Sequence, residues 1–428
     1  MIRRLTTFLA AAALAVTGTL IVARPALAAP EDYHLSWFEA AEGDVTGTYR
    51  NVIGQIEATD IGTDTLSEIT NSSDLVIQPS CSDPLPPNAT PLCFSAGDNS
   101  AEEWIPQGIT TTNDATGGSA SKILVSWYDG CSTGTQGTDW GRPNQGCQDG
   151  PNTDEAADKG VRISVYTPHV GYRNVLLVEP FFNSSDNPSF HATHMHAGGI
   201  ALYGNFLYVA DTRYGMRVFD TRKIFDLNEQ LNPTNRPTNI SDKTKVGRHS
   251  NVWYSHGYRW VWPAVGEWRR DGTGHATDCQ GVGFPMKFSY LSVDRAARYL
   301  LAGEYCPSDR SQPGRLARWQ LGSQAATSPA SGIANGWAVD AFNLPIDHIQ
   351  GGASVGGSTV YLNASDGASN YGKLWRYQVS GTSLTSGAYV SAARGCEDLS
   401  FDTWDQRIYS VSEYHDRRAI YYTRPSDF

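Results

Sequence analysis

The sequence has little positive charge, no Cys-x-x-Cys motif and no long apolar run beyond residue 28. Lysine and arginine number 33 against 44 aspartates and glutamates, and the net charge of −11 argues against a nucleic-acid backbone as the partner. The missing Cys-x-x-Cys spacing removes a common zinc and redox motif, and the missing apolar run leaves no candidate membrane span. Long amphipathic helical patterns are scarce too, whereas the 42 glycines favour short strands joined by tight turns.

Residues 1–28 have the features of a signal peptide. Arg3 and Arg4 precede an apolar stretch, and Ala26-Leu27-Ala28 ends it with the small-residue pattern that signal peptidase cleaves. We therefore expect a secreted, extracellular protein whose mature chain has about 400 residues, enough for a large single core.

Seven cysteines in an exported chain indicate disulfides. Their spacing suggests local pairs, which leave Cys396 over. The expected pairs are Cys81 with Cys93, Cys131 with Cys147, and Cys279 with Cys306.

One unit recurs along the chain: a strand, a short turn, a second strand, a polar loop and a third strand. Its clearest copy is AGGIALYGNFLYVADTRYGMRVFD, residues 197–220, and looser copies lie at 123–180, 288–321, 350–379 and 397–423. Repeats of short strands at intervals of roughly 45 residues are typical of a β-propeller. We expect an all-β propeller over residues 121–428, with five blades favoured and six or seven open; an irregular β-sandwich is the alternative.

Residues 29–120 form a polar segment rich in Thr, Asp, Ser and Pro, with few regular strands. Because the segment contains a predicted disulfide, we expect an irregular arm that wraps the body, or that completes one blade, and not a disordered tail.

Ionisable and amide side chains cluster at two recurrent positions of the unit. In a propeller, the residues before the first strand and after the second strand gather on the same side, which we call the inlet face, so these side chains are expected to share one pocket. Polar caps at strand ends are the structural alternative for each of them taken singly. Those before first strands are His194, His196, Gln350 and Glu397; those after second strands are Asp211, Arg213, Glu304 and Glu413.

Three chemistries fit such a set. His194 and His196, two apart on a strand, would point to the same side and could ligate a metal ion with Glu397 or Glu413. Elimination at a uronate needs a base, for which His194 or His196 is suited, and donors such as Arg213 and Gln350 to neutralise the substrate carboxylate. Tyr254 and His256 are the reserve proton donors.

Glycoside hydrolysis instead needs two carboxyl groups, about 5–5.5 Å apart for retention or roughly 6.5–9.5 Å for inversion. Glu304, Glu397, Glu413 and Asp211 supply enough candidates. A non-catalytic sugar-binding propeller would use the same pocket without an activated acid or base.

The strings HAGGIALYGNFLYVADTRYGMRVFD, FSYLSVDR, GRLARWQL, QGGAS and EDLSFD resemble, over about residues 160–423, a family of secreted β-propeller proteins from bacteria and fungi. Among characterised propellers the sequence is similar in character to polysaccharide lyases of the rhamnosyl-glucuronate type. The resemblance implies a uronate-directed histidine site, for which His194, His196 and Arg213 are the matching residues.

The preferred hypothesis from the sequence is a polysaccharide lyase that acts at a uronate of a plant-type polysaccharide; a glycoside hydrolase is second and a sugar-binding module third. The expected partner is a polysaccharide or oligosaccharide. No cofactor is required by this chemistry, a divalent metal ion stays open, and we expect a monomer.

Overall fold

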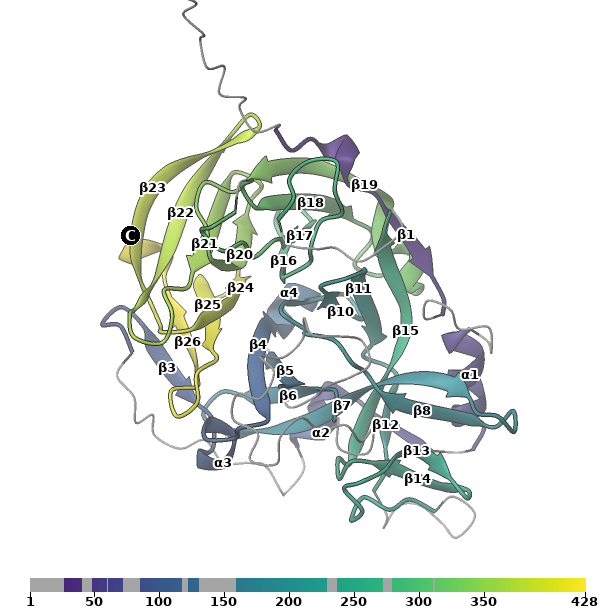
Figure 1. Ribbon diagram of the computed structural model, residues 1–428. Helices are drawn as coiled ribbons and strands as arrows, with labels where there is room; N and C mark the ends of the chain where they lie inside the picture. The colour runs from purple at the N-terminus through teal and green to yellow at the C-terminus, as the bar shows by residue number, and fades with distance from the viewer. Residues whose placement is uncertain are drawn as a thin grey trace, which may run out of the picture.

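Strands make up most of the regular structure in the computed structural model of the protein, so the expected all-β class is confirmed (Figure 1). Residues 1–26 of the predicted signal peptide (residues 1–28) and the predicted disulfide residues Cys81, Cys131 and Cys147 lie outside the described residues. Within the described part of the chain, no helix is long and apolar enough to cross a membrane. The structure describes residues 27–40, 48–59, 61–71, 85–117, 122–130, 159–228, 237–271, 279–310 and 312–428.

Residues 29–120, expected to form an irregular arm, contain β4 (Trp104–Thr111), which pairs with β5 (Ile123–Asp129), so the strands of the body begin before residue 121. The same segment adds three short strands to sheets from later parts of the chain. β1 (Leu35–Phe38) pairs with β15 (Trp260–Arg270), and β2 (Gly62–Asp64) pairs with β12 (Ile224–Asp226). β3 (Thr90–Cys93) pairs antiparallel with β26 (Ala419–Thr423) and so supplies the outer strand of the last sheet. The expected irregular arm thus contains regular pieces, because each finds an open strand edge to pair with.

The helices are short and lie mainly in this segment. α1 (Tyr49–Glu57) begins at Thr48, whose side chain accepts the Asn51 backbone N–H at 3.3 Å. It buries Tyr49, Val52, Ile53 and Ile56, which recur at helical spacing and so form one apolar face. The other helical turns are η1 (Pro30–Asp32), α2 (Leu66–Thr70), α3 (Ala96–Asn99), α4 (Thr112–Thr116), η2 (Pro329–Ser331) and η3 (Pro425–Asp427).

Three antiparallel four-stranded sheets form the C-terminal part, each in simple up-and-down order. Short turns join the first and second strands of each sheet, as expected from the sequence units at 288–321, 350–379 and 397–423. The first sheet contains β16 (Tyr290–Asp294), β17 (Tyr299–Gly303), β18 (Arg315–Leu321) and β19 (Ile333–Asn343). The second contains β20 (Ile349–Val355), β21 (Thr359–Ala364), β22 (Gly372–Ser380) and β23 (Ser383–Ala392). The third contains β24 (Cys396–Asp402), β25 (Arg407–Ser412), β26 and β3.

A twelve-stranded sheet forms the remainder of the body because β15 joins two units. β15 pairs parallel with β7 through residues 260–263 and antiparallel with β11 through residues 264–269. A separate hairpin, β13 (Val246–His249) and β14 (Val252–Ser255), projects beside β8. The first unit is β4 (Trp104–Thr111), β5 (Ile123–Asp129), β6 (Val161–Thr167), β7 (Gly171–Phe182) and β8 (Pro188–Ala192); the second is β9 (Ile200–Tyr203), β10 (Phe206–Asp211), β11 (Gly215–Asp220) and β15.

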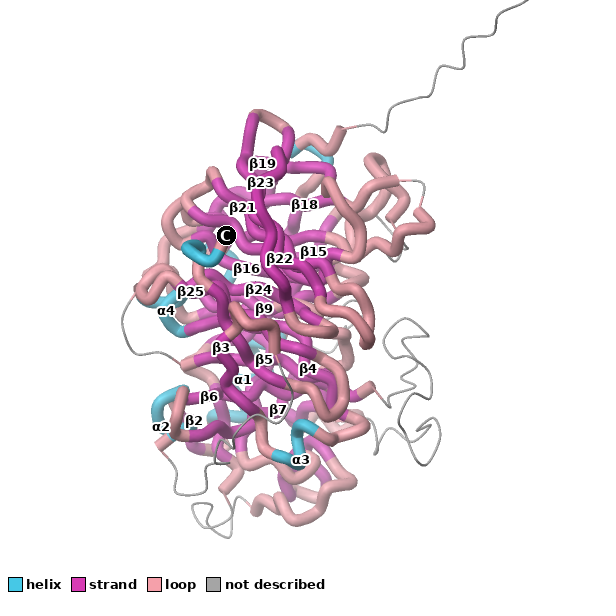
Figure 2. The backbone as a smooth tube through the Cα atoms, turned by 90° about the vertical axis from the view of Figure 1, so that its left-hand side faces the viewer, coloured by secondary structure: helices cyan, strands magenta, loops and turns pink. Residues whose placement is uncertain are grey.

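The first strands of the units contact one another in a closed ring. β4 contacts β9 and β24, β16 contacts β9 and β20, and β20 contacts β24. Later strands of each unit, such as β19 and β23, lie towards the outside, and Figure 2 shows the same sheets from the side. The molecule therefore has a β-propeller-like all-β fold.

Glycines let the strands of this ring approach closely. A Cβ added at Gly199, just before β9, would lie 2.1 Å from a backbone nitrogen of β16. One added at Gly108 in β4 would lie 2.8 Å from the first backbone nitrogen of β9, and one at Gly351 in β20 would lie 2.6 Å from a carbonyl oxygen of β24. Any larger residue at these positions would force the ring apart.

Asp398 of β24 ties the ring together. The side chain is fully buried, and its Oδ2 accepts the backbone N–H groups of Ile109 in β4 and Ile200 in β9, both at 3.1 Å. Burial raises the pKa of Asp398 well above its ordinary value, and backbone donors, among them Leu291 of β16, offset part of that rise. Asp398 thus links the backbones of different units and is a structural residue.

Candidate functional site

Gln350 and Glu397 meet at the inlet face. Gln350 lies at the start of β20 and Glu397 at the start of β24, and the Gln350 amide donates to Glu397 Oε1 at 3.2 Å. Glu397 is buried and Gln350 is half-buried. These two residues come from separate sheets, as the placement of first strands in the sequence predicts.

Glu413 forms a similar contact, with a glutamine of β4. It follows β25, is half-buried, and accepts the amide N–H of Gln107 at 3.4 Å. Gln107 is buried in β4, at a register shift between Pro106 and Ile109 that breaks the regular alternation of the strand. The two glutamates of the third sheet are therefore each held by a glutamine from a neighbouring unit.

Cys396 lies near both glutamates. It is a free, buried cysteine that directly precedes Glu397 in the sequence. It also pairs in register with Ser412, the residue before Glu413. Burial raises the pKa of the Cys396 thiol, and the negative charges of Glu397 and Glu413 raise it further. The inlet face thus contains a carboxylate pair built from one sheet.

The sequence analysis missed Gln107, although a signal for it was present. Gln107-Gly108 in WIPQGITT and Gln350-Gly351 in HIQGGAS are the same dipeptide at the start of two ring strands. In both, the glycine permits close contact with the next ring strand and the glutamine binds a carboxylate of the third sheet. Gln107 lies within residues 29–120, where the composition predicts few regular strands, so the repeat pattern does not place it at the start of a ring strand.

His194 and His196 lie in the connection between β8 and β9 and are half-buried. His196 packs against Tyr128 of β5 with ring centroids 4.7 Å apart. The expected strand geometry at these histidines is wrong, because β9 begins only at Ile200 and Ala197 has φ of 52°. Because the two histidines do not lie on a strand, strand alternation does not direct both imidazoles to one side.

Asp211 and Arg213 lie in a second, buried charged cluster. They flank the turn between β10 and β11, where Asp211 accepts the Arg213 backbone N–H at 3.2 Å and the Arg217 Nε–H at 3.2 Å. Arg217 also pairs with Glu179 of β7. Burial raises the pKa of Asp211 to about 7, the charge of Glu267 adds to the rise, and Arg213 opposes it.

Glu267 completes this cluster from β15. It accepts the Tyr49 hydroxyl of α1 at 3.1 Å and the Arg269 Nε–H at 2.8 Å. The carboxylates therefore have fixed internal partners, and the cluster joins α1, β7, β11 and β15 through charge-assisted hydrogen bonds.

Replacing Asp211 with asparagine is expected to flatten the dependence of stability on pH. A buried carboxyl whose folded-state pKa is raised binds its proton more tightly when folded, so stability is greatest below about pH 4 and falls as the pH rises to about 7. The asparagine cannot ionise, so the decrease in the free energy of unfolding between about pH 4 and pH 7 should be smaller in the variant by up to about 4 kcal/mol.

Urea unfolding of the Asp211→Asn variant at about pH 4, 6 and 8 measures this change. Asp366→Asn, at an exposed aspartate, is the matched control and should keep the slope of the wild type. A slope in Asp211→Asn equal to that of the wild type would contradict the assignment.

Glu304 is not an available carboxylate, which corrects its expected role in binding substrate. It is fully buried and accepts Arg315 Nε–H at 2.8 Å and Arg315 Nη2–H at 2.6 Å. It also accepts the backbone N–H groups of Lys287 and Arg315, each at 3.0 Å. These four hydrogen bonds join the Glu304 carboxylate to Arg315 and to the backbone just before β16.

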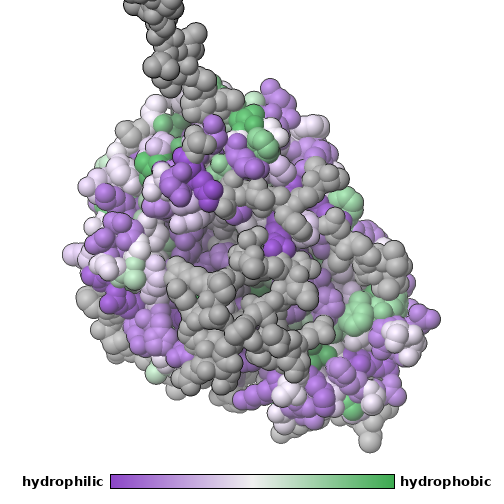
Figure 3. Space-filling view, in the orientation of Figure 1, coloured by the Kyte–Doolittle hydropathy of each residue, from purple (hydrophilic) through white to green (hydrophobic). Residues whose placement is uncertain are grey.

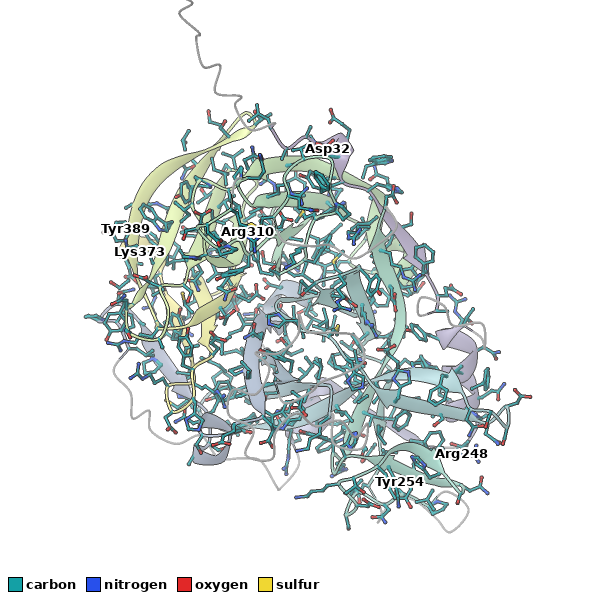
Figure 4. All side chains as sticks on the ribbon, in the orientation of Figure 1. Asp32, Arg248, Tyr254, Arg310, Lys373 and Tyr389 are labelled. Atoms are coloured by element: carbon teal, nitrogen blue, oxygen red, sulfur yellow. A yellow bond between two sulfur atoms is a disulfide. The ribbon has the colours of Figure 1, made fainter. Side chains whose placement is uncertain are left out.

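Tyr254 and His256 lie away from the ring, so their expected role as reserve proton donors is wrong. Both belong to the β13–β14 hairpin, and Figure 4 places Tyr254 beside Arg248 at the periphery of the molecule. Lys245 lies 5.0 Å above the Tyr254 ring, and His256 Nδ1 is 3.2 Å from the Lys243 carbonyl oxygen. The strands of this hairpin have the same alternation of apolar and polar residues as the ring strands. The sequence pattern alone therefore does not show that they lie outside the ring.

Potential metal ligands gather at one place in the described part of the chain. Ligand atoms of Cys279, Glu304 and Cys306 lie within 4.8 Å of one another. Cys279 and Cys306 form a disulfide with Cα atoms 5.9 Å apart, and Glu304 is neutralised by Arg315, so this group does not fit a cation. Among the described residues, neither His194 nor His196 belongs to a group of three such ligands.

Two further cysteines bear on the disulfide predictions. Cys93, expected to pair with Cys81, is disulfide-bonded. Cys396, expected to be left over, is a free cysteine.

The structural similarities found among known proteins are distant. No family model and no curated protein matches the sequence. PhoX from Pseudomonas fluorescens, solved in complex with vanadate, a transition state analogue, has 9% identity and a TM-score of 0.33, over 86% of this chain and 98% of that chain. Hydrazine synthase from Kuenenia stuttgartiensis has 8% identity and a TM-score of 0.28 over 60% of this chain, which spans 53% of that protein. Similarities of this size carry no argument about function.

Proposed function

We propose that the ring is the axis of a five-bladed β-propeller. Each of the strands β4, β9, β16, β20 and β24 begins one up-and-down unit and contacts at least two others of the set. In this assignment, β3 completes the blade of β24–β26, and the inlet face is the side at which the five ring strands begin.

On this face we propose a site of a secreted carbohydrate-active enzyme that cleaves glycosidic bonds in a polysaccharide. The observation that carries the proposal is the carboxylate pair, in which Glu397 and Glu413 are each hydrogen-bonded to a glutamine from another unit. Two fixed carboxyl groups at one point are the minimum that glycoside hydrolysis needs.

The proposed mechanism assigns the two glutamates different roles. Glu397, the more buried of the two, is assigned to protonate the glycosidic oxygen as the bond to the anomeric carbon breaks. Glu413 is half-buried, and as a carboxylate it is assigned to take the proton of an attacking water or to attack the anomeric carbon itself. Gln350 and Gln107 fix the orientation of the two carboxyl groups.

Elimination at a uronate is the second candidate, favoured by the contact between His196 and Tyr128. A histidine beside a tyrosine offers a base for the proton next to the uronate carboxylate and an acid for the leaving oxygen. It ranks second because the donors expected to neutralise that carboxylate are engaged with the protein's own acids. Gln350 donates to Glu397, and the charge of Arg213 acts on Asp211.

One assay on gum arabic and other uronate polysaccharides separates these chemistries. Ultraviolet absorbance of a conjugated alkene is followed while reducing ends are measured in parallel. Reducing ends without the absorbance support hydrolysis by the glutamates, the absorbance supports elimination, and silence in both assays across neutral and acidic polysaccharides would refute an enzyme of this class.

Substituting His196 with alanine is expected to separate the candidates in a second way. If elimination occurs, the variant should abolish alkene formation, since the base is lost, while the midpoint of thermal unfolding stays within about 5 °C because the side chain is only half-buried. A variant with unchanged turnover would remove His196 from either mechanism.

A further inference from the structure

A separate pocket of about 380 Å³ lies outside the ring. It is bounded by the N-terminal residues 32–35, by the end of β15 and by the loop that precedes β16. Figure 4 places Asp32, one of its residues, near the upper margin of the molecule, and Figure 3 shows a small hydrophobic patch near this margin on a mostly hydrophilic face. This volume is within the range of small-ligand sites.

The wall of the pocket is held rigidly. Arg315, besides its bonds to Glu304, donates to the carbonyl oxygens of Gly281 at 2.7 Å, Phe284 at 2.8 Å and Pro285 at 3.2 Å. The disulfide between Cys279 and Cys306 anchors the same loop. A loop with its carbonyl groups and one end fixed in this way is organised before any ligand arrives, which lowers the entropy cost of binding.

The floor of the pocket is an aromatic surface. Trp319 and Phe288 both line it and stack with ring centroids 5.7 Å apart. The Trp319 Nε1 atom is itself buried, so a ligand would contact the rings and not this donor.

The rim presents exposed rings beside carboxylates. Phe284 is 51% exposed on the rim, and Trp337, 47% exposed, stacks on the rim residue His34 with ring centroids 4.4 Å apart. Asp271 accepts from His34 at 2.9 Å, and both Asp271 and Asp32 line the pocket with further acceptor capacity. Aromatic faces with adjacent carboxylate acceptors match the apolar face and the hydroxyl edge of a sugar ring.

The charge of the rim selects among sugars. Two aspartates line it, while Arg270 directs its Nε–H and Nη2–H groups to the Arg213 carbonyl oxygen at 3.1 Å and 2.6 Å. Arg270 offsets only one of the two negative charges, so a uronate carboxylate would meet a net negative charge at the rim. We propose that this pocket is a non-catalytic subsite for a neutral pyranose, and this proposal does not depend on the cleavage chemistry proposed for the ring.

Binding is tested by isothermal titration and saturation-transfer NMR with the methyl glycosides of rhamnose, galactose, glucose and arabinose, and with glucuronic acid. At least one neutral glycoside is expected to bind saturably, with a dissociation constant on the order of millimolar, and more tightly than glucuronic acid. Phe284→Ala should weaken that binding about threefold to tenfold through loss of one stacking face.

Tyr389→Ala is the matched control, because Tyr389 is also 51% exposed but does not line the pocket; Figure 4 shows it at the left of the molecule and Asp32 at the upper right. It should bind as the wild type does. The absence of saturable binding by every neutral glycoside, or binding unaffected by Phe284→Ala, would overturn the subsite whatever the cleavage assay shows.

Discussion

Replacing Glu413 with glutamine is expected to lower kcat/KM on the polysaccharide substrate by about a thousandfold or more. The substitution keeps the shape of the side chain and an oxygen that can accept from Gln107, 3.4 Å away in the structure. It removes the charge and the basicity that water activation or nucleophilic attack requires. Glu397→Gln should cause a loss of similar size, since an amide cannot protonate a leaving oxygen.

The control for both variants is Asp366→Asn. Asp366 follows the second strand of the neighbouring unit, as Glu413 does in its own, but it is exposed. Steady-state rates and urea unfolding of all three variants are compared. Glutamine variants that fold as stably as the wild type and keep more than about a tenth of its activity would exclude a carboxylate mechanism.

The substitution Asp398→Ala is expected to cost about 3–5 kcal/mol of stability. Asp398 Oδ2 accepts two backbone N–H groups, from Ile109 and Ile200, deep in the ring. Alanine would leave both donors buried without a partner and would open a cavity where three ring strands meet. Urea unfolding at neutral pH measures the loss.

Asp398→Asn is the informative comparison. The asparagine oxygen can take the place of Oδ2 and keep both hydrogen bonds, and a buried carboxyl group whose pKa is strongly raised gains little from its charge. This variant should therefore lose no more than about 1.5 kcal/mol. Equal losses in the alanine and asparagine variants would show that the carboxylate charge, and not its acceptor role, stabilises the ring.

The repeated strands could be predicted from the sequence because their signals are local. The unit at 197–220 contains β9, β10 and β11, and the unit at 397–423 contains β24, β25 and β26, as alternation and turn residues indicated. The stretch VWYSHGYRWVWP, residues 252–263, contains β14 and the start of β15. The parallel pairing of β15 with β7 could not be predicted from this local pattern, because the paired residues are about 85 positions apart in the sequence.

The candidate site could be predicted only where a side chain's role follows from its position in the unit. Gln350 and Glu397 meet because both begin ring strands. Glu304 occupies an equally good position after a second strand, yet Arg315 takes up its carboxylate. The partner is an arginine eleven residues later, and nothing in a single sequence shows whether such an arginine points to the carboxylate or to solvent. The same limit applies to Asp211 and Arg217.

The pairing of β3 with β26 also sets the order in which the protein can fold. Residues 90–93 leave the ribosome long before their partners at 419–422, which follow more than 320 residues later. β3 and β26 can therefore pair only when a loop of that length closes, which is a slow step. During that interval β3 and β26 each have an unpaired edge, which makes the time between translation and closure the period when this protein is most exposed to aggregation.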